Sequence, residues 1–156
     1  MPEPWGAEGT NPDIGEDRRY RLVLADDHPG VRQEIRRLLD SEFDVLRDVG
    51  DGDELLAATG ELRPDAVISD IRMPKLSGIE AGCEVLRRGL CEAVVVLSMY
   101  PDPHLVETAL QAGIRAYVLK VDASEELIPA VYAALRGECY LSSGVRNRSN
   151  IDRSNP

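Results

Sequence analysis

The sequence predicts an α/β domain: a parallel sheet with helices packed on both of its faces. Between Arg19 and Gly137, five short apolar runs alternate with five segments whose apolar residues recur three or four positions apart. Such alternation is typical of a doubly wound parallel sheet. In addition, four of the apolar runs end in a polar or charged residue, at the sheet edge where ligands bind in such folds.

The five apolar runs are rich in Val, Ile and Leu, as expected for strands that are buried on both faces. In chain order they cover residues 20–25, 43–49, 65–69, 93–97 and 115–119. Right-handed crossovers leave few ways of ordering these strands. We adopt the flavodoxin-like order 2-1-3-4-5, a known arrangement that these residues do not by themselves establish, which puts the first and third strands side by side.

Each apolar run is followed by a helical pattern with its own start or stop signal. In chain order, the predicted helices cover residues 29–40, 54–61, 77–88, 102–112 and 124–136. Pro29 suits the first turn of its helix, Asp53 can cap the second helix, and Asp102 opens the fourth. Gly113 and Gly137 are suitable residues to end the last two helices.

Composition limits the class of protein. The 156 residues suffice for one domain with tails, and the net charge of -10 argues against nucleic-acid binding by this chain while it suits a bound cation. No apolar run approaches the roughly 20 residues of a membrane span, and no secretory signal opens the chain. Three cysteines without disulfide or zinc-type spacing indicate reduced thiols, so we expect a cytoplasmic protein with no membrane contact.

The chain divides into three parts. Residues 1–18 contain prolines, glycines and acidic residues without periodicity, which predicts a disordered acidic leader. Residues 19–137 carry the alternating elements and form the predicted domain. Residues 138–156 contain too few apolar side chains for a core of their own, so we predict a polar C-terminal tail or the start of an interdomain linker.

The polar residues at four strand ends point to one chemistry. Asp26 and Asp27 follow the first strand, Asp70 follows the third, Ser98 the fourth and Lys120 the fifth. Because these strand ends share one edge of a parallel sheet, the side chains are expected to converge. Carboxylate oxygens suit Mg²⁺, and a carboxylate can carry a phosphoryl group. The pattern predicts a site that binds a divalent cation and forms an aspartyl phosphate.

Each of these residues alone has an ordinary structural explanation. The Asp26–Asp27 pair fits a turn before a helix, and Asp70 fits a strand-end cap. Ser98 is a common turn residue, and Lys120 is a common surface residue. Only their joint occurrence at four strand ends favours a functional site.

From residue 19 to residue 137 the chain resembles a bacterial response-regulator receiver domain, which has the flavodoxin-like (CheY-like) fold. The resemblance is carried by Leu24-Ala25-Asp26-Asp27-His28, Ser69-Asp70-Ile71-Arg72-Met73-Pro74 followed by Gly78, Leu97-Ser98, and Tyr117-Val118-Leu119-Lys120. The runs Ser98-Met99-Tyr100 and Glu138-Cys139-Tyr140-Leu141-Ser142 resemble the NarL/FixJ (LuxR-type) subfamily. Members of that subfamily usually continue into a helix-turn-helix output domain, which this sequence lacks.

The resemblance implies a phosphorelay role and assigns functions to individual residues. Asp70 would accept a phosphoryl group from a sensor histidine kinase, and Ser98 and Lys120 would contact that group. The implied Mg²⁺ ligands are Asp27, Asp70, the backbone carbonyl of Arg72 and, through water, Asp26. Such a domain is a signalling switch that catalyses only its own phosphorylation and dephosphorylation.

The resemblance also implies a switch and a set of residues that tune the lifetime of the phosphoryl group. When Ser98 moves toward the phosphate, Tyr117 would swing into the space behind it and alter the face formed by the last strand and the last two helices. Arg72, Met99 and Tyr100 are expected to flank the route of hydrolytic water and to slow dephosphorylation. A homodimer is compatible with the subfamily.

One position departs from the family pattern, and two other functions compete. Val121 stands where the family usually has a proline after Lys120, so we expect a trans peptide bond there. A phosphorylation-independent dimerisation or scaffold module is the first alternative. An aspartate-nucleophile phosphohydrolase is the second; Arg72 argues against it because such enzymes usually carry a second Asp at that position.

Overall fold

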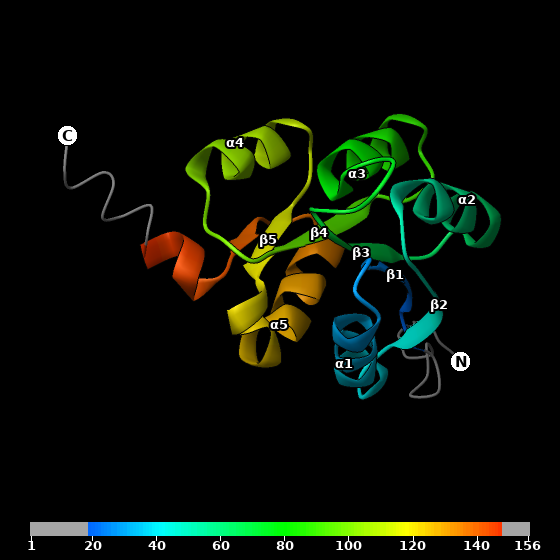
Figure 1. The fold of residues 1–156 in the computed structure, drawn as a ribbon, viewed down its shortest axis with the longest axis horizontal. Coiled ribbons are helices and arrows are strands. Elements are labelled where there is room, and N and C mark those ends of the chain that lie inside the picture. The colour runs from blue at the N-terminus through cyan, green and yellow to red at the C-terminus, as the bar shows by residue number, and fades with distance from the viewer. Residues whose placement is uncertain (1–18, 148–156) are drawn as a thin grey trace, which may run out of the picture.

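The structure, a computed structural model, describes residues 19–147 and confirms the predicted α/β fold (Figure 1). Its six-stranded parallel sheet has the order β2-β1-β3-β4-β5-β6, which is the predicted order with one short strand added. The strands are β1 Arg21–Ala25, β2 Asp44–Val49, β3 Ala66–Asp70, β4 Ala93–Ser98, β5 Ala116–Leu119 and β6 Tyr140–Leu141. The predicted leader, residues 1–18, and residues 148–156 of the predicted tail lie outside the described residues.

Five α-helices and one short 3₁₀ turn, η1, connect the strands in the described part of the chain. The helices are α1 Pro29–Asp40, α2 Gly52–Leu62, α3 Gly78–Arg87, α4 Pro103–Gln111 and α5 Ala123–Leu135, and η1 covers Lys120–Asp122. Between residues 19 and 147, every helix is too short or too polar to cross a lipid bilayer.

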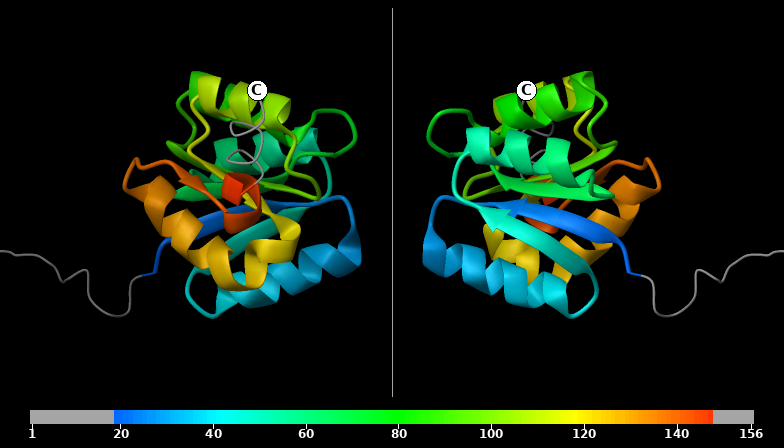
Figure 2. Two further views of the ribbon diagram at one scale, coloured as in Figure 1. Left: turned by 90° about the vertical axis from the view of Figure 1, so that its left-hand side faces the viewer. Right: turned by 90° about the vertical axis from the view of Figure 1, so that its right-hand side faces the viewer.

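The helices form two layers, with α1 and α5 on one face of the sheet and α2, α3 and α4 on the other (Figure 2). Alternate residues of each strand enter opposite layers, as the two-residue period of a strand requires. On β1, Leu22 and Leu24 belong to the core beneath α1 and α5, whereas Val23 and Ala25 belong to the core on the other face. Burial on both faces explains why the strands are continuously apolar.

All predicted helix and strand boundaries agree with the structure to within two residues, but α2 is capped by a different residue from the predicted Asp53. Its N-cap is Asp51, whose side chain accepts a hydrogen bond from the Glu54 amide at 2.8 Å, and the helix starts at Gly52. A Cβ on Gly52 would lie 2.4 Å from Cβ of Leu76. The loop that follows β3 therefore packs directly on the first turn of α2, which only glycine permits.

The larger difference between prediction and structure lies after residue 137, where Tyr140–Leu141 form the parallel strand β6 beside β5. Ser142 and Val145, which follow, are buried. These residues join the core of the domain although they cannot form a core alone. The sequence does not predict β6, because a strand of two residues is too short for a periodic pattern.

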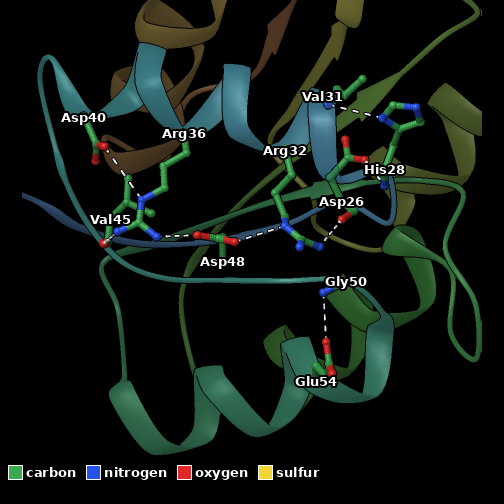
Figure 3. A network of polar contacts seen from close by, with 10 residues as sticks. All are labelled: Asp26, His28, Val31, Arg32, Arg36, Asp40, Val45, Asp48, Gly50 and Glu54. Carbon is green, nitrogen blue, oxygen red and sulfur yellow. Dashed lines mark hydrogen bonds and ion pairs between the residues drawn. The ribbon is translucent and has the colours of Figure 1, made fainter.

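Two arginines of α1 tie that helix to the edge of the sheet (Figure 3). Arg32 pairs with Asp48 of β2 at 3.0 Å and donates a hydrogen bond to the backbone carbonyl of Asp26 at 2.9 Å. Arg36 pairs with Asp48 as well and donates to the carbonyl of Val45 at 3.0 Å. The loop that follows β1 is thereby connected to β2 through side chains of α1.

Gly78 fixes the place where β3 and α3 meet. Its amide donates to the carbonyl of Ile71 at 2.8 Å, and a Cβ at this position would lie 2.1 Å from the backbone oxygen of Asp70. That distance is much shorter than a van der Waals contact, and the backbone oxygen cannot rotate away as a side chain could. Any larger residue would therefore push the start of α3 away from the end of β3.

We expect Gly78→Ala to lower the free energy of unfolding by about 1–3 kcal/mol, the usual effect of overpacking, measured by urea denaturation. Gly60→Ala is the matched control, because Gly60 lies inside α2 and its Cβ would meet its nearest neighbour only at 4.0 Å. That change should raise stability by about 0.5–1 kcal/mol through helix propensity. Equal effects of the two changes would contradict the close contact at Gly78.

Candidate functional site

The carboxyl ends of four adjacent strands bring the predicted polar residues together. Asp70 and Ser98 are the last residues of β3 and β4, Asp26 directly follows β1, and Lys120 directly follows β5. The parallel register pairs Asp70 with Leu97 and Ser98 with Leu119, so the strands end at similar heights. The sequence-predicted site residues are thus gathered at one edge of the sheet.

Three carboxylates form the acidic part of this edge. One oxygen each of Asp26, Asp27 and Asp70 lies within 4.8 Å of the others. Asp26 is fully buried, Asp70 is nearly so, and Asp27 is exposed. Bringing three negative charges this close is unfavourable without a positive charge between them.

The backbone and side chain of Asp26 are held from several sides (Figure 3). Its amide donates to the carbonyl of Val49, its carbonyl accepts from Arg32, and its Oδ1 accepts from the His28 amide at 2.9 Å. His28 in turn caps α1 through Nδ1, which accepts from the Val31 amide. Arg32 on α1 and His28, which caps that helix, are therefore supports of the site that strand-end reasoning missed; their positions carry no separate signal.

The other oxygen of Asp26 tests whether a cation fits here. Asp26 Oδ2 is buried, and between residues 19 and 147 its close polar partner is Lys120 Nζ at 2.9 Å. The carboxylate oxygens of Asp26, Asp27 and Asp70 together form a donor set that suits a hard divalent cation such as Mg²⁺.

Lys120 bridges two of the carboxylates. Its ammonium lies 2.9 Å from Asp26 Oδ2 and 3.2 Å from Asp70 Oδ2. Burial alone would lower the pKa of Lys120, but the contacts with Asp26 and Asp70 outweigh it and raise that pKa. Lys120 consequently remains positively charged and partly neutralises the acidic cluster.

For Asp70, burial and a neighbouring negative charge outweigh the effect of Lys120 on its pKa. Burial raises the pKa of its carboxyl group, Lys120 lowers it, and the negative charge of Asp26 raises it again, so that the pKa lies above its ordinary value. The backbone amide of Arg72 lowers the pKa of Asp70 by the smallest of these effects. An ionised Asp70 is thus a partly desolvated carboxylate, which is a better nucleophile than one in bulk water.

Ser98 and Tyr117 meet at one backbone carbonyl. Ser98 Oγ donates to the carbonyl of Tyr100 at 2.9 Å, and the hydroxyl of Tyr117 donates to the same oxygen at 3.3 Å. Tyr117 is completely buried, so its ring already occupies the interior beside Ser98. Burial raises the pKa of its phenol. Tyr117 is therefore buried, with its hydroxyl bonded to the loop after β4 to which Ser98 is also bonded.

Comparison with known proteins identifies the family. A family profile described as "Response regulator receiver domain" matches residues 22–132. This chain belongs to that family. The receiver is 35% identical over 122 residues to the uncharacterized transcriptional regulatory protein YxjL of Bacillus subtilis, an alignment that covers 77% of this chain and 56% of YxjL. The chain thus spans about half the length of this curated relative.

Solved structures place this receiver in the NarL/LuxR-type group. A LuxR-family two-component response regulator from Aurantimonas superposes with a TM-score of 0.80 at 28% identity, covering 88% of this chain and 99% of that one. The isolated receiver of RcsB from Salmonella enterica, solved with the phosphomimetic BeF₃⁻, superposes with a TM-score of 0.75 at 26% identity, covering 83% and 97%. A receiver is a signalling domain rather than a classical enzyme.

An open cleft of about 160 Å³ gives access to Asp70 in this receiver. Its lining includes the three residues predicted to tune phosphate lifetime, Arg72, Met99 and Tyr100, and these are exposed. Asp102 also lines the cleft. The sequence predicted this residue only as the start of the fourth helix. Its carboxylate is engaged in capping α4 through the amides of His104 and Leu105.

The loop that follows β5 departs little from the expectation for this receiver. Between residues 19 and 147 every peptide bond is trans, as predicted for Lys120–Val121. Lys120 begins the 3₁₀ turn η1, and Val121 is 82% exposed. Without the family's usual proline, the ammonium group of Lys120 still reaches both buried carboxylates.

We expect Asp70→Asn to raise the stability of the receiver near neutral pH by on the order of 1 kcal/mol, because it removes a buried charge beside Asp26. The pKa of Asp70 is raised in the folded state, so the wild type loses stability as the pH rises through that pKa. The gain should be full at about pH 7 and should vanish below the unfolded value, about pH 4.

Urea denaturation of both proteins at the two pH values measures this difference. Asp53→Asn, at an exposed carboxylate of α2, is the control and should show no such gain. A gain of equal size at both pH values, or a loss of stability near neutral pH, would contradict a raised pKa for Asp70.

Proposed function

We propose that this receiver accepts a phosphoryl group on Asp70 from a sensor histidine kinase in a two-component phosphorelay. The observation that carries the proposal is the position of Asp70: its carboxylate lies 3.2 Å from Lys120 and borders the open cleft. Asp26 and Asp27 stand beside it. This arrangement offers a nucleophile, a fixed positive charge and oxygen donors for a metal ion.

In the proposed reaction an oxygen of the Asp70 carboxylate attacks the phosphorus of a phosphohistidine. An O–P bond forms, the P–N bond breaks, and the imidazole leaves with the electron pair of that bond. Lys120 stabilises the negative charge on the phosphoryl oxygens. Mg²⁺, held by Asp27, Asp70, the backbone carbonyl of Arg72 and, through water, Asp26, would neutralise further charge on those oxygens.

The shared carbonyl of Tyr100 supports a switch role for Ser98 and Tyr117. Both hydroxyls donate to this one oxygen. If Ser98 Oγ turns toward a phosphoryl oxygen, Tyr117 remains the sole side-chain donor to the Tyr100 carbonyl. The loop after β4 and the face formed by α4, β5 and α5 then shift together. A partner that prefers the shifted face draws the population toward it.

We infer the output and partners of this switch from the relatives. YxjL is a transcriptional regulatory protein, so we propose that this receiver controls transcription through a partner or an output domain and contacts no nucleic acid itself. RcsB, whose receiver superposes on this one, also forms dimers on DNA, which supports a homodimer here. We place the phosphorelay in the cytoplasm. We extend the signalling core of residues 19–137 to residue 147, because Tyr140–Leu141 pair with β5. Residues 1–18 remain a predicted leader, and residues 148–156 a predicted tail or linker.

Phosphorylation by acetyl phosphate with Mg²⁺, followed by intact mass, tests the proposal. Wild type should gain one phosphoryl group, about 80 Da, and Asp70→Asn should gain none. The same reaction without Mg²⁺ should be much slower. If neither protein gains mass while both are folded, the phosphorylation-independent scaffold becomes the better description. Repeated turnover of a phosphomonoester would instead indicate a phosphohydrolase.

We propose that Arg72, Met99 and Tyr100 slow hydrolysis of the aspartyl phosphate. All three line the cleft through which water reaches Asp70, and the side chains of Met99 and Tyr100 are 62% and 65% exposed. The phosphorylated receiver, freed of acetyl phosphate, should persist far longer than seconds by intact mass. Tyr100→Ala should shorten this lifetime several-fold, whereas Leu110→Ala on α4 should not. Decay within seconds in wild type would refute the shielding.

A further inference from the structure

Lys120 has to be held in place by something other than its own turn. It begins the 3₁₀ turn η1, which has no side-chain cap, and its neighbour Val121 is 82% exposed. A lysine has a long flexible side chain that loses considerable conformational entropy when it is fixed in one position. The backbone at Lys120 must therefore be anchored if the ammonium is to remain between Asp26 and Asp70.

Hydrogen bonds from the segment after α5 supply such anchors on both sides of Lys120. On one side, the amide of Leu119 donates to Ser142 Oγ at 3.0 Å, in a buried position. On the other side, Asp122 Oδ2 accepts from the amide of Gly144 at 2.9 Å. A third bond joins the amide of Ser142 to the carbonyl of Tyr117 at 3.1 Å. The residues before and after Lys120 are thus bound to the same short segment.

This segment, residues 140–145, is itself fixed to the domain. Glu126 of α5 accepts hydrogen bonds from the Tyr140 hydroxyl at 2.9 Å and from the Ser143 amide at 3.0 Å. Val145 is 1% exposed. A Cβ on Gly144 would lie 2.5 Å from Cδ1 of Leu119, so the segment packs on β5 as closely as a backbone can.

We propose that residues 140–145 act as a clip that positions Lys120 for phosphoryl transfer, with Ser142 as the main positioning residue. The inference rests on the proposed function, because it assigns a supporting element to the lysine of that site. Coupling between two sites is reciprocal. Filling the site at Asp70 therefore changes the stability of the clip.

Ser142→Ala tests the clip, because it removes the acceptor of the buried Leu119 amide. The matched control is Ser143→Ala, which removes a hydroxyl that accepts from Arg146 and lies beside Glu126 but retains the amide bonds to Glu126. At saturating acetyl phosphate and Mg²⁺, Ser142→Ala should be phosphorylated roughly fivefold more slowly, a modest rise of the barrier. The control should keep the wild-type rate. Mg²⁺ affinity, measured by calorimetry, should be unchanged in the control and should not fall in Ser142→Ala, because a displaced Lys120 takes positive charge away from the carboxylates.

Tyr140→Phe is a second, milder variant for the case that Ser142→Ala fails to fold. It removes one hydrogen bond to Glu126 at the base of the clip and leaves β5 unchanged. Phosphorylation should slow by a smaller factor, and amide hydrogen exchange of Leu119 and Gly144 should become faster. Faster exchange with an unchanged phosphorylation rate would overturn the inference. A parallel loss of rate, Mg²⁺ affinity and global stability would also overturn it, because it would show a merely structural role.

Failure of the proposed function gives a different result. If wild type takes no phosphoryl group, the clip is judged from crystal structures of wild type and Ser142→Ala. A displaced Lys120 ammonium, with the remaining sheet unchanged, supports the positioning role without any phosphorylation. An ammonium that still contacts Asp26 and Asp70 refutes it.

Discussion

The ion pairs of Lys120 with Asp26 and Asp70 are the interaction on which the rest of the site depends. Two buried carboxylates at this edge repel one another, and only a cation between them makes their proximity tolerable. Lys120 supplies that charge at 2.9 and 3.2 Å. The same repulsion leaves the edge receptive to a further cation, because three carboxylates share one lysine and Asp27 is exposed.

Holding like charges together requires a rigid frame, and the sheet provides it. The acidic residues lie at the carboxyl ends of β1 and β3, which are hydrogen-bonded neighbours. Arg32 fixes the carbonyl of Asp26, and Gly78 lets α3 begin directly against the carbonyl of Asp70. Neither residue touches a substrate, yet both restrict how far the carboxylates can move apart. At this edge of the sheet the repulsion between carboxylates is destabilising, whereas the backbone that carries them is held rigidly.

Much of this was predictable from the sequence, and the exceptions have physical reasons. Continuous apolar runs predict the five main strands, and polar residues at their ends predict where Asp70, Ser98 and Lys120 lie. The two-residue strand β6 has no period to detect. Arg32 was not predictable as a support of Asp26 because its partners, Asp48 and the Asp26 carbonyl, are defined only by how α1 packs. The inward position of Tyr117 likewise depends on a backbone carbonyl, which a sequence does not display.

Strand β6 also changes which part of the sheet can meet another protein. A bare β5 would present unpaired amide and carbonyl groups as a template for a foreign strand. Pairing with Tyr140–Leu141 occupies those groups and leaves an outer edge only two residues long. The opposite edge, β2, is longer but carries Asp44, Arg47 and Asp48. The fold thereby discourages edge-to-edge sheet extension between copies and favours assembly through helix and loop surfaces.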